Sequence, residues 1–119
     1  QPFYISNPNL KSLSIAGIWS QWKSPSGEVI NSAAVITRES VGELATIHSR
    51  MPVMMPKNNW ESWLDISPHP TDELLELMKN IHPDEGLHPW PVSSEVNKVA
   101  NNGPQLVHQI QLTDSETLF

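Results

Sequence analysis

Proline restricts how this chain can fold more than any other feature of its sequence. Eleven prolines are spread over 119 residues, and several of them are flanked by His or Asn. Proline lacks a backbone N–H donor, and it disfavours helical conformations in the residue before it. We therefore expect short strands and short helices joined by fixed turns, and no long uninterrupted helix.

The composition predicts one small folded domain. Apolar residues make up 38% of the chain and include five Trp, which separates it from weakly hydrophobic, highly charged sequences that stay disordered. A chain of this length can bury one marginal core but not two. Because no apolar run approaches the length of a membrane span, we expect a soluble protein without a membrane partner, cytoplasmic in a bacterium or nuclear in a eukaryote.

Charge and cysteine content limit the chemistry of the chain. The formal net charge is −6, and affinity for nucleic acid comes largely from Lys and Arg that neutralise phosphates. Any contact with DNA is therefore expected to be local. The chain contains no Cys, so it offers no disulfide, no thiolate zinc site and no Cys nucleophile of its own.

The first third of the sequence predicts antiparallel sheet. Three segments have the apolar and β-branched content of strands, and they are Gln1–Ile5, Leu10–Trp22 and Val29–Thr37. Lys23–Glu28 contains Pro and Gly and predicts a hairpin loop between the second and third strands. The small residues Ala16–Gly17 indicate a close approach by another backbone.

Three short helices are expected in the middle of the chain. Ser40 with Glu43, and Asn58 with Glu61, have the spacing of capping boxes at helix starts. The first of these helices is expected to end near His48.

A helix cap and a turn in the sequence predict a third helix and a last strand. Thr71 is expected to cap a helix that has acidic residues in its first turn. Asn101–Pro104 predicts a turn before a final strand over Gln105–Gln111. The residues after Leu112 are polar and are expected to form a loose tail.

His48 and Arg50 are the strongest candidates for chemistry. They lie two residues apart where a helix is expected to give way to a strand, a junction that holds polar side chains at the edge of a rigid scaffold. His can act as a general acid or base near neutral pH, and Arg has a planar fork suited to phosphate. On the residues alone a plainer interpretation stays open, in which a loop His caps the helix and the Arg pairs with a surface carboxylate.

Two other groups of residues invite functional interpretations. His82 and His88 flank an acidic loop and could ligate a metal ion, but their spacing matches no established zinc pattern, which favours solvated loop residues. We therefore expect no metal and no other cofactor. Trp60 and Trp63 could stack on nucleic-acid bases, although their helical spacing with Leu64 favours core packing.

A set of short motifs occurs in an order and spacing that resembles one protein family. The motifs are Gln1–Ile5 (QPFYI), Ala16–Trp19 (AGIW), Ile47–Pro52 (IHSRMP), Pro91–Ser93 with Val96–Asn97, and Asn102–Pro104 (NGP). Taken together they resemble the C-terminal half of an SOS-response-associated peptidase (SRAP) domain, from Gln1 to about Gln111. The His-x-Arg-Met-Pro run that begins at His48 is the most specific part of the resemblance.

The resemblance implies an α+β fold with a curved antiparallel, barrel-like sheet and a few short helices, here incomplete. Residues 1–112 would form the C-terminal portion of a single SRAP domain with a channel for single-stranded DNA, and residues 113–119 a polar tail. The family's Cys, its Asn and phosphate-binding Arg, and its catalytic Glu precede the segment that matches Gln1–Ile5. We therefore expect the nucleophile to lie in an N-terminal half that is a partner of this chain.

The resemblance also implies a function in the SOS or DNA-damage response, together with a proposed autopeptidase role. In the family an N-terminal Cys cross-links to abasic sites by forming a thiazolidine with the ring-opened sugar. His48 matches a His expected to assist proton transfer, and Arg50 matches an Arg expected to hold a DNA phosphate. Ser49 stands where the family often has Asp, which changes the local hydrogen bonding around the His. The alternative is a truncated, non-catalytic SRAP-like binding or vestigial module.

Overall fold

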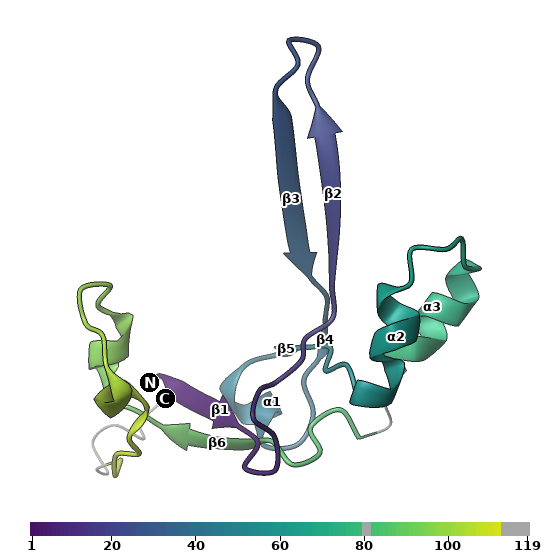
Figure 1. Ribbon diagram of the computed structural model, residues 1–119. Coiled ribbons are helices and arrows are strands. Elements are labelled where there is room, and N and C mark those ends of the chain that lie inside the picture. Colours follow the sequence, from purple (N-terminus) through teal and green to yellow (C-terminus); the bar gives the residue numbers. More distant parts are fainter. Residues whose placement is uncertain (80–81, 113–119) are drawn as a thin grey trace. The chain divides into compact units, whose positions relative to one another are not determined.

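The computed structural model describes residues 1–79 and 82–112 as short strands and short helices (Figure 1). The longest helix in this part of the chain has eight residues, in keeping with the many prolines. The strands are β1 (Phe3–Ser6), β2 (Gly17–Lys23), β3 (Val29–Val35), β4 (Thr37–Glu39), β5 (Arg50–Pro52) and β6 (His88–Pro91). The helices are α1 (Leu44–Ile47), α2 (Trp60–Leu64) and α3 (Thr71–Met78), with the 3₁₀ turns η1 (Lys57–Asn59), η2 (Ser94–Asn97) and η3 (Pro104–Val107).

The α+β class is confirmed, whereas no closed barrel forms in the described residues. The strands there pair as antiparallel two-stranded sheets, β1 with β6, β2 with β3 and β4 with β5. A barrel requires every strand to be paired along both edges, and each of these strands is paired along one.

The contacts divide the chain into two units, residues 1–11 with the chain from Gly86 onward, and residues 12–85. The predicted domain over residues 1–112 stays a prediction.

The first unit is held together by the β1–β6 pair. Phe3 lies opposite Pro91, and the pairing continues because the Val92 N–H donates to the carbonyl of Pro2 over 3.1 Å. Val92 is buried. The rings of Tyr4 and Trp90 contact each other across the strands, with centroids 5.0 Å apart and planes tilted by 49°, a cross-strand contact that stabilises such pairs.

The predicted final strand over Gln105–Gln111 is wrong for most of its length. Pro104 instead begins η3, because Gly103 takes a positive φ of 142° and proline suits the first position of a helical turn. Only Gln109 makes a bridge, to Val92. The Trp90 Nε1–H donates to the carbonyl of Val107 over 2.9 Å and holds the end of η3 in place. The expected tail, residues 113–119, lies outside the described residues.

The second unit contains the predicted hairpin. Strands β2 and β3 run side by side (Figure 1), in register from Gly17 opposite Val35 to Lys23 opposite Val29. The loop closes where the Ser24 N–H donates to the Glu28 carbonyl over 2.8 Å. Every residue of both strands is exposed, so neither face of this hairpin is covered by the described residues.

A small core lies beside the hairpin in the second unit. Ala16, Val53 and Met55 are buried together, and Ile36, Trp63 and Met78 pack against them. The Ala16 N–H donates to the Val53 carbonyl over 2.8 Å, and the Ile36 N–H donates to the Ala16 carbonyl over 3.0 Å. The expected close approach of another backbone at Ala16 is therefore confirmed.

The helices are close to their predicted places, but the predicted caps are wrong. Glu43 and Asn59 occupy the N-cap positions of α1 and α2, and neither makes a side-chain capping bond. The Ser40 hydroxyl is buried and has no hydrogen-bond partner among the described residues. Thr71 is the first residue of α3 and Pro70 precedes it as the N-cap. Helix α1 ends at His48 as predicted, after a single turn.

Candidate functional site

His48 ends helix α1 and begins the approach to β5. Its backbone N–H donates to the carbonyl of Leu44 over 3.0 Å, and its own backbone is extended, with φ of −153° and ψ of 145°. Leu44 is only 5% exposed, so burial of this side chain anchors the short helix. The His48 side chain is exposed, and its ring is accessible from solvent.

The imidazole of His48 is oriented by the backbone of Arg50. The Arg50 N–H lies 2.9 Å from Nδ1 of the ring, and the Arg50 carbonyl oxygen lies 3.0 Å from the same nitrogen. Nδ1 can accept from the N–H or donate to the carbonyl, depending on the tautomer. In either case the ring is held through Nδ1, and no partner for Nε2 is recorded among the described residues. Nε2 is the atom available for proton transfer.

The guanidinium of Arg50 is held by Thr37 on the neighbouring strand. Nε donates to the Thr37 hydroxyl over 3.2 Å, and Nη2 donates to the same hydroxyl over 3.0 Å and to the Thr37 carbonyl over 2.6 Å. None of the ion pairs in residues 1–79 and 82–112 involves Arg50. The plainer interpretation, an Arg paired to a surface carboxylate, is therefore wrong for this part of the chain.

The short β4–β5 ladder positions both side chains. Beyond the paired strands, the Ser40 N–H donates to the Ser49 carbonyl over 3.0 Å and extends the ladder toward His48. Met51 follows Arg50, points to the opposite face as alternation requires, and is 2% exposed. Burial of Met51 fixes the strand, so its other face presents Arg50. The arrangement places an imidazole and a guanidinium on one junction.

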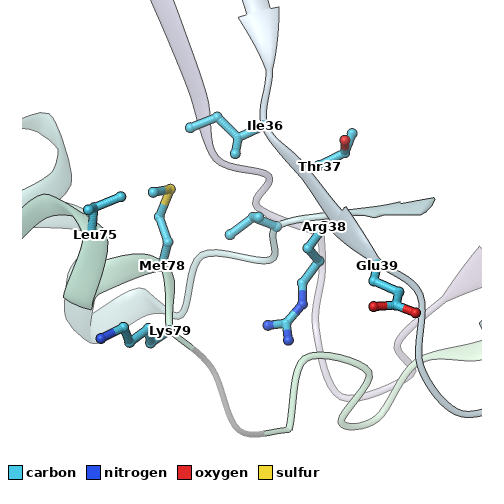
Figure 2. Close-up of a pocket in the computed structure, with 8 residues that line it drawn as sticks. Ile36, Thr37, Arg38, Glu39, Leu75, Met78 and Lys79 are labelled. Carbon is cyan, nitrogen blue, oxygen red and sulfur yellow. The ribbon is translucent and has the colours of Figure 1, made fainter.

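An open groove of about 440 Å³ lies between β4 and α3 (Figure 2). Side chains of Leu75 and Met78 reach from the helix toward Ile36. Lys79 at its rim is paired with Glu76. The groove is lined by both apolar and charged side chains. Its lining residues are Ile36, Thr37, Arg38, Glu39, Val53, Leu75, Met78 and Lys79. No single sequence motif marks this surface.

His82 and His88 are the two residues that were considered as metal ligands. His82 and His88 fall in different units. Within the described ranges, no group of three or more His, Asp or Glu side chains could hold a metal ion. No helix described there is long and apolar enough to cross a membrane.

Trp60 and Trp63, the tryptophans considered for stacking on bases, differ in how far they pack into the core. Trp63 packs against the buried cluster, as expected. Trp60 is partly exposed and donates its Nε1–H to the Met55 carbonyl over 2.9 Å. Leu64, which shares their predicted face, is 73% exposed. Helical spacing therefore identified the packing role of Trp63 but not the exposure of Leu64.

Two exposed carboxylates are stabilised in their charged form. The Ser67 N–H and hydroxyl, with a smaller contribution from His69, hold the pKa of Asp65 below its ordinary value. The pKa of Glu95 is lowered by hydrogen bonds from Lys98 and Asn101. Both carboxylates tie together local turns. Neither is among the residues that contact His48 or Arg50.

The sequence matches known abasic-site processing proteins. It is 40% identical over 98 residues to the abasic site processing protein HMCES of Mus musculus, covering 82% of this chain and 27% of that protein. It is 29% identical over 106 residues to the abasic site processing protein YoqW of Bacillus subtilis, covering 89% of this chain and 47% of that protein. The chain thus spans about a quarter to a half of the length of these relatives.

The fold also matches solved structures. A crystal structure of a protein from Bacteroides thetaiotaomicron superposes with a TM-score of 0.75 at 24% identity, over 92% of this chain and 48% of that one. A protein from Bordetella bronchiseptica gives a TM-score of 0.58 at 22% identity, over 74% of this chain and 43% of that one. The model of the family described as "SOS response associated peptidase (SRAP)" matches residues 1–99. With the ordered motifs around His48, these matches establish that the chain belongs to the SRAP family.

Proposed function

We propose that this chain is part of a protein that binds single-stranded DNA and forms a covalent cross-link with abasic sites. The observation that carries the proposal is the junction at His48 and Arg50, where one ladder presents an imidazole Nε2 and a guanidinium to solvent. The names of the relatives support abasic DNA as the substrate class. Membership of the SRAP family supports the same chemistry.

In the proposed reaction, an N-terminal Cys amine adds to the aldehyde of the ring-opened sugar. The carbinol oxygen then leaves as water, and the Cys thiol adds to the resulting C=N bond to close a thiazolidine. Departure of that oxygen requires a proton, and the return reaction requires its removal. Nε2 of His48 supplies and recovers this proton while Nδ1 stays bound to the backbone of Arg50.

Arg50 is proposed to bind a phosphate of the DNA strand. A guanidinium recognises phosphate oxygens through charge-assisted hydrogen bonds. The net charge of −6 makes a broad electrostatic attraction to DNA unfavourable, so binding through this chain depends on local cations such as Arg50.

The nucleophile must be supplied by polypeptide other than these residues, because the 119 residues contain no Cys. We propose the N-terminal half of an SRAP domain as this partner. The exposed β2–β3 hairpin supports the proposal, since an isolated two-stranded hairpin is marginally stable in water and gains stability from further strands.

The test is a cross-linking assay with the full-length polypeptide that contains this chain. A single-stranded oligonucleotide with one abasic site is the substrate, and covalent product is measured on denaturing gels, both as it forms and as it reverses. His48→Ala is expected to slow at least one direction by roughly 100-fold, the usual scale for a lost general acid or base. His108→Ala, at another exposed histidine, is the matched control. Unchanged rates in both directions for His48→Ala would reject the proton-transfer role.

A non-catalytic binding module is the second candidate, and the lack of Cys in the 119 residues favours it. The same assay separates the two functions. If the wild-type polypeptide retains the oligonucleotide without forming any covalent product, the binding module is supported and the cross-linking function is rejected.

A further inference from the structure

Thr37 accepts all the hydrogen bonds that the guanidinium of Arg50 makes within the described residues. The hydroxyl accepts from Nε and from Nη2, and the main-chain carbonyl accepts from Nη2. The two residues are separated by 13 positions in the sequence. They meet because β4 and β5 pair antiparallel, with Glu39 opposite Arg50 and Thr37 opposite Pro52, which places all four side chains on one face.

The partner of Arg50 is neutral, and this decides what remains available to a ligand. Glu39 is directly opposite Arg50 in the ladder, yet no ion pair between them is found in the described ranges. A carboxylate partner would occupy the N–H donors with a competing anion. The hydroxyl and carbonyl of Thr37 hold the group without binding a negative charge to it.

The hydrogen bonds also determine which end of the guanidinium faces outward. Nε and Nη2 are engaged by Thr37. No partner of Nη1 is recorded among the described residues, so its two N–H groups are the donors left for an incoming anion. A phosphate would therefore be bound through the Nη1 end, and the side of the guanidinium that carries Nε would stay on the protein.

Thr37 itself is fixed by the core of the second unit. The preceding residue, Ile36, donates its N–H to the Ala16 carbonyl over 3.0 Å and accepts from the Val53 N–H over 2.9 Å. Thr37 is β-branched and has few χ1 rotamers. Thr37 therefore follows directly on backbone that is hydrogen-bonded to the core, and it lines the groove of Figure 2.

We propose that Thr37 is a positioning residue for Arg50. Before DNA binds, it holds the guanidinium without pairing its charge to a carboxylate, and it leaves Nη1 directed at a DNA phosphate. This inference rests on the proposed function, in which Arg50 binds DNA. Its effect is to remove the rotamer freedom that a long, exposed Arg side chain would otherwise lose on binding.

The test measures binding of single-stranded DNA to the full-length polypeptide over a range of salt concentrations. Thr37→Val keeps the shape of the side chain and removes the hydroxyl acceptor. We expect roughly fivefold weaker binding, the scale of one hydrogen bond, with the salt dependence kept because the charge of Arg50 is kept. Thr37→Ser is expected to bind more tightly than Thr37→Val, and Thr71→Val, at an exposed Thr on α3, is the matched control.

Arg50→Ala is measured alongside, because it separates this inference from the proposed function. It is expected to weaken binding and to reduce the slope of log Kd against log salt by roughly 0.7, the value for one phosphate on a single strand. The double variant is expected to bind like Arg50→Ala alone. If Arg50→Ala weakens binding while Thr37→Val does not, the positioning role of Thr37 is overturned and the role of Arg50 stands.

If Arg50→Ala binds as tightly as the wild type, the phosphate role of Arg50 fails and the positioning role of Thr37 fails with it. A second measurement needs no substitution. The Nε–H of Arg50 is expected to give a resolved NMR signal that is protected from exchange with water, because Thr37 accepts from it. Rapid exchange of that proton in the wild-type protein would also overturn the inference.

Discussion

A guanidinium held by a neutral hydroxyl has no counter-charge bound to it, whereas one held by a carboxylate is already paired with an anion. Arg50 is of the first kind, through Thr37. His48, two residues earlier, is oriented by the backbone of Arg50. The two candidate residues are therefore supported by groups that do not compete with DNA phosphate for the cation.

Gly42 is a residue at which substitution is expected to destabilise the protein. Its φ of 56° lies in the left-handed region, and an added Cβ would overlap Oδ2 of Asp84. Gly42→Ala is expected to lower the free energy of unfolding by about 1–2 kcal/mol from the backbone conformation, because the end of the Asp84 side chain can turn away from the added Cβ. Urea denaturation of the full-length polypeptide measures the loss.

Gly27→Ala is the control for Gly42→Ala. Gly27 also has a positive φ, of 90°, but nothing lies within 4 Å of the position of an added Cβ. It is expected to show a similar conformational cost. A much larger loss at Gly42 would show that Asp84 does not turn away, and no loss at Gly42 would contradict the observed backbone conformation.

At the scale of elements, the connection between α2 and α3 is organised around one carboxylate. Asp65 accepts from the N–H and hydroxyl of Ser67 over 2.9 and 2.7 Å, and His69 Nε2 lies 3.0 Å from its other oxygen. This local pattern is an Asx turn. It sets the direction in which the chain leaves α2, and α3 contributes Leu75 and Met78 to the groove.

The lowered pKa of Asp65 predicts how this connection responds to pH. A carboxyl whose pKa is lower in the folded state contributes stability above its unfolded pKa, near 3.8, and loses that contribution as the pH falls through the folded value. Ser67→Ala removes the hydroxyl donor and keeps the N–H, so the pKa of Asp65 is expected to rise but to stay below its ordinary value. NMR titration of the carboxyl carbon measures this, and an unchanged pKa would contradict the assigned cause.

Sequence patterns located these elements better than they located the contacts at their ends. The hairpin loop and the end of α1 at His48 were predictable because turns and helix ends depend on neighbouring residues. The caps at Ser40 and Asn58 were not, since a capping-box spacing does not reveal which backbone conformations precede the helix. The strand expected over Gln105–Gln111 failed because Pro104 suits a helical turn as well as the start of a strand.

At the scale of the whole molecule, the uncovered hairpin is the dominant feature. Trp19 is 74% exposed and Ile18 59% exposed, and alternation places them on opposite faces of β2. Both faces of the hairpin thus carry large apolar side chains. Strands that are apolar on both faces are typical of sheets covered on both sides.

The isolated 119-residue chain is therefore expected to self-associate. Exposed apolar surface and unpaired strand edges both favour contacts between copies. Size-exclusion chromatography with light scattering measures this directly, and Trp19→Ser is expected to reduce the association. A clean monomer that unfolds cooperatively would contradict the prediction.

The sequence by itself determined that the strands and helices are short. It also determined the hairpin and the junction that holds His48 and Arg50, because proline geometry, turn chemistry and strand content act over a few neighbouring residues. Only the tertiary structure decided that Arg50 is held by Thr37, that Met51 is buried behind it and that a groove lies beside β4. These features depend on the register of β4 against β5 and on the packing of α3, which bring together residues that are distant in the chain.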